Sequence, residues 1–330
     1  MDARESTERA ETRVHALVVV GIIAIIVSST AVSLRLWWRW HSSDLRFWWD
    51  DWFLAATTIT SHILIAVIVA WTHYGLGQDF DSITASSFLP SLYFAKFSVL
   101  LYSVTLWLIK MSALLLYARI FGLSDWFRRL LRIFGVYVTL WSTAVIVVPW
   151  FDCVPVRKTL DPSASGVCYQ MLGWYYAAAI IDALTDLLIL LLPMPLVWHL
   201  KAPLRRKLIV TAAFVFGYCS AVLSFVRFVK IVHKPNLLNL EPSTGQYYQT
   251  LPLPLLSMLQ APLAIIAICG PSIGQSVVRV RQRHITTSFS RKGISISSSV
   301  NTCRTYNSEN DQVRLHGMKY DEHGLENALL

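Results

Sequence analysis

Two aspartates in an apolar stretch are the residues of this sequence with the clearest potential for chemistry. Asp182 and Asp186 are four residues apart, so a helix would project both carboxylates from one face. Lys110 and Arg227 also lie in apolar stretches, and each such charge costs about 2.5–3.5 kcal/mol in the middle of a membrane-spanning helix. Two interpretations stay open. The four charges form an interhelical ion-pair network that fixes helix packing, or they line a polar cavity that holds a ligand, binds a cation or passes a proton.

The depth of these charges in their stretches favours one pairing. Asp186 lies in the second half of the fifth stretch, and Arg227 lies near the end of the sixth. Consecutive stretches cross the membrane in opposite directions, so these two residues lie toward opposite faces of the membrane. A direct contact between Asp186 and Arg227 would therefore need long side chains or a bridging water. Lys110 lies in the same half of the layer as Asp186. We therefore predict that Lys110 is the closer partner of Asp186.

The elements that must position these charges are seven stretches of about twenty mostly apolar residues. A hydrocarbon layer about 30 Å thick needs roughly 20 helical residues to cross it. Backbone groups in lipid must be satisfied within a helix or a closed barrel, and the short alternating pattern of barrel strands is missing here. We predict an all-α membrane protein with seven transmembrane helices, at Val14–Leu34, Trp52–Trp71, Phe94–Tyr117, Leu130–Trp150, Trp174–Leu192, Leu208–Val229 and Leu251–Ile273.

The composition excludes a soluble globule. Hydrophobic residues make up 55% of the chain and charged residues only 15%, whereas ordinary domains carry about 25% charge. The formal net charge of +9 could suggest nucleic acid as a partner. The basic residues are instead scattered over short loops beside helices, which is typical of membrane topology and contact with anionic lipid. We therefore expect the lipid bilayer as a partner and no nucleic acid.

The distribution of Lys and Arg predicts the orientation of the chain. By the positive-inside rule, the side of the membrane with more basic residues faces the cytoplasm. This predicts an external amino-terminal segment at 1–13, a membrane domain at 14–273, and a basic, serine-rich, disordered cytoplasmic tail at 274–330. The expected location is the plasma membrane, with an endomembrane as the alternative. The basic residues on the predicted cytoplasmic side include Arg39, Arg46, Arg119, Arg128, Arg129, Lys201, Arg205, Arg206, Lys207, Arg279, Arg281 and Arg283.

Two of the five cysteines share one external loop. Cys153 and Cys168 lie between the fourth and fifth stretches, on the side predicted to be oxidising, so we predict a disulfide between them. Closing a loop of about 15 residues stabilises a fold by about 3 kcal/mol in the entropic model. Two free thiols are the alternative. A zinc site would need further Cys or His ligands that this loop does not supply, so we expect no metal.

Local signals mark the ends of several stretches. Asp50 and Asp51 precede the second stretch, where one carboxylate is expected to cap the helix and the other to contact basic loops on the same face. The surrounding tryptophans are typical of an interfacial belt. Pro193 and Pro195 are expected to end the fifth helix. Four prolines predict an irregular seventh helix: Pro252, Pro254, Pro262 and Pro271.

These residues also carry a resemblance to a known family. The run Leu45–Trp52, which ends in Asp50-Asp51-Trp52, resembles the entry to the second helix of the fungal rhodopsin-domain membrane proteins. Several further motifs of this family follow along the chain. Together the motifs cover roughly residues 15–275, and their order is specific to the family. The further motifs, in order, are Tyr74-Gly75-Leu76-Gly77, Lys110–Phe121 with Arg119, Cys153-Val154-Pro155 with Cys168, Asp186, Pro193-Met194-Pro195 through Lys207, and Phe216-Gly217 with Arg227.

The sequence departs from the family pattern in three places. Gln78-Asp79 follow Gly77 where the family has a basic residue and His, and Arg157-Lys158 stand where an aromatic residue is usual. The seventh stretch, usually entered with a Glu, has Ser257–Gln260 instead. No retinal cofactor is expected, because a retinal Schiff base needs a lysine in the seventh helix and Leu251–Ile273 has none.

The resemblance implies a rhodopsin-like arrangement of seven helices and a receptor-like protein that senses an apolar or small ligand. It implies cytoplasmic signalling partners at Arg119, at the loop Lys201–Lys207 and at the tail. The alternative is a membrane enzyme of secondary metabolism that uses Asp182 or Asp186 as a general acid for a cyclisation or isomerisation. A transporter comes third, because the seven stretches show no related halves.

Overall fold

The computed structural model of the chain describes residues 3–41, 48–76, 85–121, 125–160, 165–169, 171–194, 204–233 and 252–291. Seven of its helices are long and apolar enough to cross a membrane, one for each predicted stretch. The protein is a seven-helix membrane bundle, as predicted. The helices are α1 (Ala3–His41), α2 (Trp49–Thr72), α3 (Ala85–Phe121), α4 (Asp125–Val147), α6 (Leu172–Leu191), α8 (Leu204–His233) and α9 (Pro252–Arg291).

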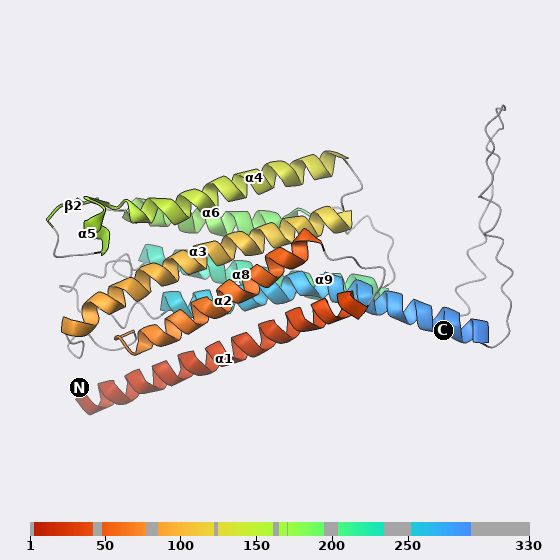
Figure 1. The fold of residues 1–330 in the computed structure, drawn as a ribbon, viewed down its shortest axis with the longest axis horizontal. Helices are drawn as coiled ribbons and strands as arrows, with labels where there is room; N and C mark the ends of the chain where they lie inside the picture. Colours follow the sequence, from red (N-terminus) through yellow and green to blue (C-terminus); the bar gives the residue numbers. More distant parts are fainter. Residues whose placement is uncertain are drawn as a thin grey trace. The chain divides into compact units, whose positions relative to one another are not determined.

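The connection between α4 and α6 has structure of its own. A 3-10 turn at Val148–Trp150 continues α4, and β1 (Cys153–Val154) then pairs antiparallel with β2 (Val167–Cys168). The one-turn helix α5 (Arg157–Leu160) lies between the two strands. This hairpin and the amino-terminal end of α1 lie at the same end of the bundle, on the left of Figure 1.

Most of the helices extend beyond the predicted spans, and α1 (Ala3–His41), α3 (Ala85–Phe121) and α9 (Pro252–Arg291) extend furthest. α1 continues past Leu34 to His41, because Arg35 and Arg39 are buried against carboxylates of α2. α9 is one helix from Pro252 to Arg291, although Pro262 and Pro271 lie inside it. The tail expected from residue 274 therefore begins with helical residues, and its part after Arg291 lies outside the described residues.

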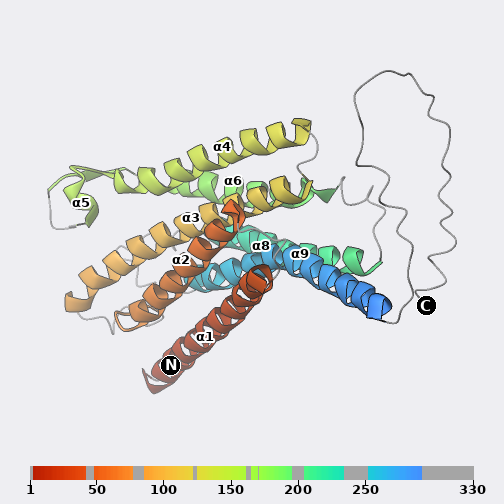
Figure 2. The same cartoon turned by 45° about the vertical axis from the view of Figure 1, so that its right-hand side comes forward.

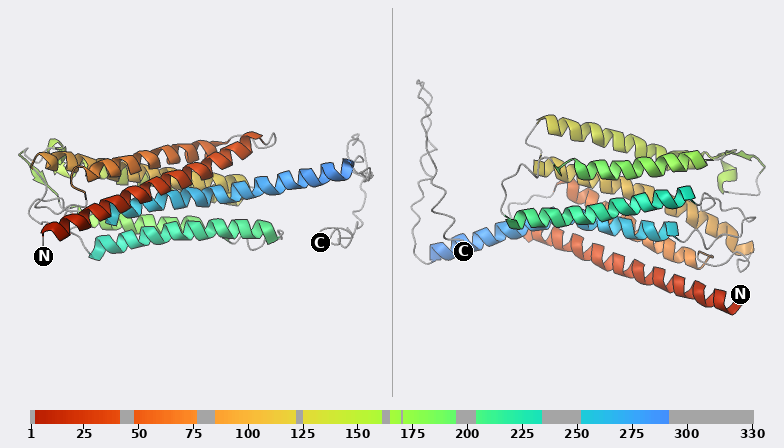
Figure 3. Two further views of the ribbon diagram at one scale, coloured as in Figure 1. Left: turned by 90° about the horizontal axis from the view of Figure 1, so that it is seen from below. Right: turned by 180° about the vertical axis from the view of Figure 1, so that it is seen from behind.

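The packing of the bundle centres on α3 and α9, which have the largest shares of buried residues among the spanning helices. α3 packs against α2, α4 and α6, while α1 packs on α2 and α6 packs on α8 (Figures 1 and 2). α8 and α9 lie side by side in both views of Figure 3. The bundle belongs to one compact unit, Met1–Arg281, and Gln282–Leu330 form a second unit.

Apolar side chains cover both the interior and the outer surface of the helices. The core includes Leu54, Leu64, Ile65 and Ile265, which are almost fully buried. Large apolar residues point outward on several helices. Such side chains are stable against the hydrocarbon of a bilayer, whereas their exposure to water is costly. They include Ile22, Ile26, Ile59, Ile133, Leu140, Leu184 and Phe225.

Candidate functional site

Three polar clusters lie along α3, each built around one of its basic residues. Lys96 belongs to the first, Lys110 to the second and Arg119 to the third, and we name the clusters after these residues. At 1.5 Å per helical residue, Lys96 and Lys110 are about 21 Å apart along the axis and Lys110 and Arg119 about 13 Å. The clusters therefore lie at one end, in the interior and at the other end of the bundle.

The Lys110 cluster brings together three of the charges singled out in the sequence. Lys110 Nζ lies 2.8 Å from Asp182 Oδ1 and 3.5 Å from Asp186 Oδ1. The Lys110 side chain is 3% exposed, and those of Asp182 and Asp186 are 20% and 15% exposed. The depth of the charges in the sequence predicted Asp186 as the partner of Lys110. In the structure one ammonium serves both carboxylates, and the shorter contact is to Asp182.

Further polar residues, which the sequence argument did not assign to the site, complete the Lys110 cluster. The Ser224 hydroxyl donates to Asp186 Oδ2 at 2.5 Å, and Gln260 Nε2 donates to Ser224 Oγ at 2.6 Å. The Tyr102 hydroxyl in turn donates to Gln260 Oε1 at 2.8 Å. The sequence could have indicated Gln260 as a member of this cluster, because an amide in an apolar stretch needs buried hydrogen-bond partners. The network thereby joins α3, α6, α8 and α9.

Arg227 meets this network at Tyr102 and not at the carboxylates. Its guanidinium carbon lies 3.9 Å from the centre of the Tyr102 ring, a cation–π contact, and Nη1 donates to the Ser257 hydroxyl. Among the described residues, no carboxylate comes within ion-pair distance of Arg227. The structure therefore does not bring this fourth charge into direct contact with the two aspartates.

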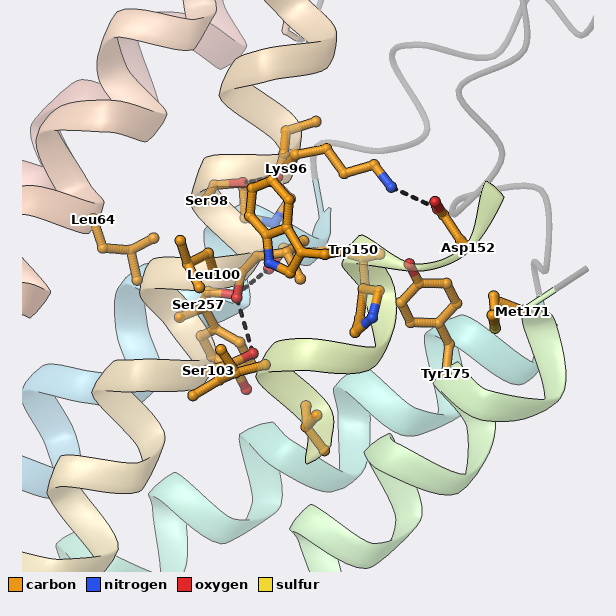
Figure 4. Close-up of a pocket in the computed structure, with 18 of the residues that line it drawn as sticks. Leu64, Lys96, Ser98, Leu100, Ser103, Trp150, Asp152, Met171, Tyr175 and Ser257 are labelled. Carbon is orange, nitrogen blue, oxygen red and sulfur yellow. Dashed lines mark hydrogen bonds and ion pairs between the residues drawn. The ribbon is translucent and has the colours of Figure 1, made fainter. Parts of the chain in front are cut away.

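A cavity of about 440 Å³ lies between the Lys110 cluster and the hairpin end of the bundle. Its lining comes from several elements: in Figure 4, Leu64 lies on one side and Met171 and Tyr175 on the other, with Ser103 and Ser257 between them. A second cavity of about 70 Å³ shares part of this lining, including Tyr102, Ser103 and Arg227, and reaches Asp182. The volume of the larger cavity lies in the range of sites for small molecules, about 300–1,000 Å³.

The Lys96 cluster attaches the hairpin to α3 at the wall of the larger cavity. Lys96 Nζ lies 2.8 Å from Asp152 Oδ2 (Figure 4). The Thr159 hydroxyl donates to Asp152 Oδ1 at 2.8 Å. The disulfide between Cys153 and Cys168 is present, as predicted, and joins the paired positions of β1 and β2. Asp152 and Cys168 both line the cavity, so the hairpin forms part of its wall.

The Arg119 cluster is a buried group of two acids and three bases. Asp50 Oδ2 lies 2.6 Å from Arg35 Nη2 and 3.1 Å from Arg39 Nη2, and Asp50 Oδ1 lies 3.1 Å from Arg119 Nη1. Asp51 contacts the same three arginines. The side chains of Asp50 and Asp51 are 0% and 2% exposed. The cluster joins α1, α2 and α3 at the end opposite to the hairpin.

This cluster corrects one expectation and extends another. Asp51 does cap α2, since it accepts a hydrogen bond from the Trp48 amide at 3.3 Å. The partners expected in the basic loops lie instead on α1 and α3. Arg35 was missed because it lies one residue beyond the predicted end of the first span. Its Nη1 also donates to the Ile268 carbonyl at 2.8 Å, which ties α1 to α9 beside Pro271.

Residues 34–279 match a family model described as the fungal rhodopsin domain. The chain belongs to the fungal rhodopsin-domain family. It is 29% identical to a SAT4 family membrane protein of Emericella nidulans over 49% of this chain and 43% of the relative. It is 26% identical to the satratoxin biosynthesis SC1 cluster protein 4 of Stachybotrys chartarum over 52% of this chain and 60% of the relative.

A third relative of this fungal rhodopsin-domain protein is the polyenoic acids biosynthesis gene cluster protein Ba17b of Metarhizium anisopliae. The two are 22% identical over 63% of this chain and 60% of the relative. The chain thus spans between 43% and 60% of the length of these curated relatives. No solved structure matches it.

The remaining family-motif residues of this fungal rhodopsin-domain protein lie outside the three polar clusters. Trp52 is 67% exposed on α2, and Gly75 adopts a φ of 108° in the turn after α2, a conformation that favours glycine. Pro193 is buried just after α6 ends, and Lys207 lies on α8. Gly77 and Pro195 lie outside the described residues. In the described ranges, no three His, Cys, Asp or Glu residues gather in a group that could hold a metal ion.

Proposed function

We propose that this protein is a receptor-like membrane protein that senses a small ligand in the 440 Å³ cavity. The observation that carries the proposal is the position of Tyr102. Its side chain lines the cavity, and its hydroxyl bonds to Gln260, which is 1% exposed and belongs to the Lys110 cluster. A ligand that contacts Tyr102 therefore touches a buried network that joins four helices.

The network supports a sensing role for a physical reason. Ligand binding changes a protein's conformation only if the ligand interacts differently with two states. Buried polar networks on packed helices have discrete arrangements, because each donor and acceptor must keep a partner. A ligand that displaces the Tyr102 hydroxyl would require Gln260, Ser224 and Asp186 to find new partners. Such rearrangement would move α6 and α8 relative to α3.

We propose that the hairpin end faces the cell exterior and that the Arg119 end and residues 274–330 face the cytoplasm, with residues 14–273 as the membrane domain and 1–13 outside. The disulfide at the hairpin supports this orientation, since disulfides persist in oxidising surroundings. The larger number of basic residues on the other side supports it as well. Signalling partners would then bind near Arg119, Lys201–Lys207 and the tail, and the plasma membrane is the proposed location.

The test is to find what the cavity retains. The protein would be purified in lipid nanodiscs, incubated with a solvent extract of fungal culture, washed, and analysed by mass spectrometry for retained compounds. Ser103→Trp would fill the cavity, because Ser103 lines both chambers. Leu140→Trp is the matched control, since Leu140 is 67% exposed on the lipid-facing side of α4. A compound retained by the wild type and Leu140→Trp, but lost in Ser103→Trp, would support sensing; equal retention in all three would refute it.

A membrane enzyme of secondary metabolism is the second candidate, and one contact favours it. Asp182 lines the smaller cavity, and its carboxylate pairs with Lys110. A substrate that entered this cavity would therefore contact an acidic side chain. Relatives named for the satratoxin and polyenoic acids biosynthesis clusters agree with such a setting. Metabolite profiles of cells with Asp182→Asn decide between the two roles. An accumulated precursor at normal protein levels would indicate an enzyme, whereas an unchanged profile would favour the receptor.

A further inference from the structure

Six lysine and arginine side chains lie buried or half-buried on the described parts of the spanning helices, and five of them have a carboxylate partner. Arg227 is the sixth. Its partners are the face of the Tyr102 ring and the Ser257 hydroxyl, which are both neutral. A charge withdrawn from water without a counter-charge is costly. The five paired bases are Arg35, Arg39, Lys96, Lys110 and Arg119.

The acids nearby are already occupied. Asp152 and Asp182 are the described carboxylates that line the same two cavities as Arg227. Asp152 lies 2.8 Å from Lys96, and Asp182 lies 2.8 Å from Lys110. Either acid would have to leave its lysine to reach Arg227. The cavity therefore presents one cation whose charge no described side chain balances directly.

The walls beside Arg227 define what else a ligand must carry. Apolar and aromatic side chains of α2, α3, α4 and α9 form a large share of the lining of the cavity, among them Ile68, Trp71, Val99, Ile146 and Leu253. Polar residues line the cavity as well, and two of them contact Arg227: Tyr102 through the face of its ring and Ser257 through its hydroxyl. Such a site orients a molecule that has one polar end and an apolar body.

We infer that the cavity binds an amphiphilic organic carboxylate, with its carboxylate on Arg227 and Ser257 and its apolar body along the wall of α2 and α3. An arginine fork matches a carboxylate, and the pair forms charge-assisted hydrogen bonds. The inference rests on the proposed ligand cavity and adds the chemical class of the ligand. It also places the anion beside Tyr102, the residue that leads to the Lys110 cluster.

The test compares two probes that share the pyrene ring and the chain but differ in the end group, a charged carboxylate in one and a neutral alcohol in the other. Pyrenebutanoate and pyrenebutanol would be titrated into protein in phosphatidylcholine nanodiscs, with energy transfer from tryptophan to pyrene as the signal. Trp71 and Trp150 line the cavity and serve as donors. Empty discs and discs with a Ser103→Phe variant, which adds bulk to the cavity without adding a tryptophan donor, measure the uptake of each probe by lipid. We expect the acid to bind about tenfold more tightly than the alcohol, since a hydrogen bond to a charged group is worth about that factor.

Variants of Arg227 test whether this residue causes the preference for the acid over the alcohol. Arg227→Gln should remove the advantage of the acid over the alcohol, while Arg227→Lys should keep most of it. Lys230→Gln is the matched control, because Lys230 is an exposed base one turn away on α8. If Arg227→Gln does not yield folded protein, the ratio of acid to alcohol in the wild type and in Arg227→Lys decides.

The outcomes separate the two proposals. Equal binding of acid and alcohol in the wild type would overturn the inference of an anionic ligand. It would still support the proposal that the cavity binds a ligand. No binding of either probe above the level of Ser103→Phe would count against the ligand cavity itself. Repeating the titration in discs that contain phosphatidylglycerol tests a lipid headgroup as the anion. Displacement of the acid by this lipid would overturn the assignment to a free carboxylate.

Discussion

The Lys110 ammonium is shared between two carboxylates, 2.8 Å from Asp182 Oδ1 and 3.5 Å from Asp186 Oδ1. All three side chains are mostly shielded from solvent. Interactions between charges are stronger where water is excluded, and the cost of leaving one charge without its partner rises accordingly. Lys110 therefore holds α3 to α6 through charge rather than through apolar contact alone.

Removing the Lys110 charge should destabilise the bundle strongly. Lys110→Met leaves two buried carboxylates without their cation, and breaking a buried pair in this way costs about 3–5 kcal/mol. Thermal unfolding in nanodiscs measures the effect, with Lys230→Met as the exposed control. The triple variant Lys110→Met, Asp182→Asn, Asp186→Asn should recover much of the loss. A Lys110→Met protein as stable as the control would contradict the role given to this pair.

Asp50 should matter more than its position at a helix end suggests. Its carboxylate is fully buried and contacts three arginines, so Asp50→Asn should lower stability by about 3 kcal/mol or more. Asp125→Asn is the control, because Asp125 also lies in the first turn of its helix but is exposed. Monodispersity on size-exclusion chromatography and the unfolding midpoint report the difference. Similar midpoints for the two variants would indicate that the Arg119 cluster does not support the fold.

A glycine at the contact between α8 and α9 should reject a large side chain. A Cβ added at Gly270 would lie 3.0 Å from the Cβ of Ala213, whereas one added at Gly173 would meet nothing within 4 Å. Gly270→Leu should therefore destabilise the protein by about 1–3 kcal/mol, the usual cost of overpacking. Gly173→Leu should change the unfolding midpoint little. Equal effects of the two substitutions would rule out close packing at this crossing.

The hairpin should depend on its disulfide. Cys153 and Cys168 are separated by 15 residues, and opening a loop of that size costs about 3 kcal/mol in the entropic model. The double variant Cys153→Ser, Cys168→Ser should lower the unfolding midpoint and weaken retention of ligand in the cavity, whose wall the hairpin forms. Cys219→Ser is the control, since Cys219 is a free, exposed cysteine. Wild-type behaviour of the double variant would show that the Lys96–Asp152 pair suffices to hold the hairpin.

The orientation can be tested by glycosylation. The sequence contains no Asn-x-Ser/Thr site, so any glycan must come from an added one. An amino-terminal extension with an Asn-Gly-Thr sequence should be glycosylated in a fungal host, and the same extension with Gln should not. Treatment with an N-glycosidase, followed by gel electrophoresis, reads out the mass change. A glycan on a site inserted between Phe121 and Asp125, instead of on the extension, would reverse the proposed topology.

Local properties of the chain sufficed to predict the seven spans. Each span must by itself be apolar and about as long as the hydrocarbon layer is thick, so no long-range information is needed to find it. The disulfide was predictable for a similar reason, since Cys153 and Cys168 are confined to one loop. Local signals misjudged where the helices end, because Arg35 and Arg39 extend α1 through partners that belong to α2.

Only the tertiary structure decided which polar groups meet. Tyr102 and Gln260 are 158 residues apart in sequence, and their hydrogen bond depends on how α3 and α9 are rotated toward each other. No sequence pattern specifies such a rotation, because it results from the packing of all seven helices at once. The same holds for Arg227. Its sequence position indicated a costly charge, and the fold alone placed it in a cavity with a tyrosine and a serine for partners.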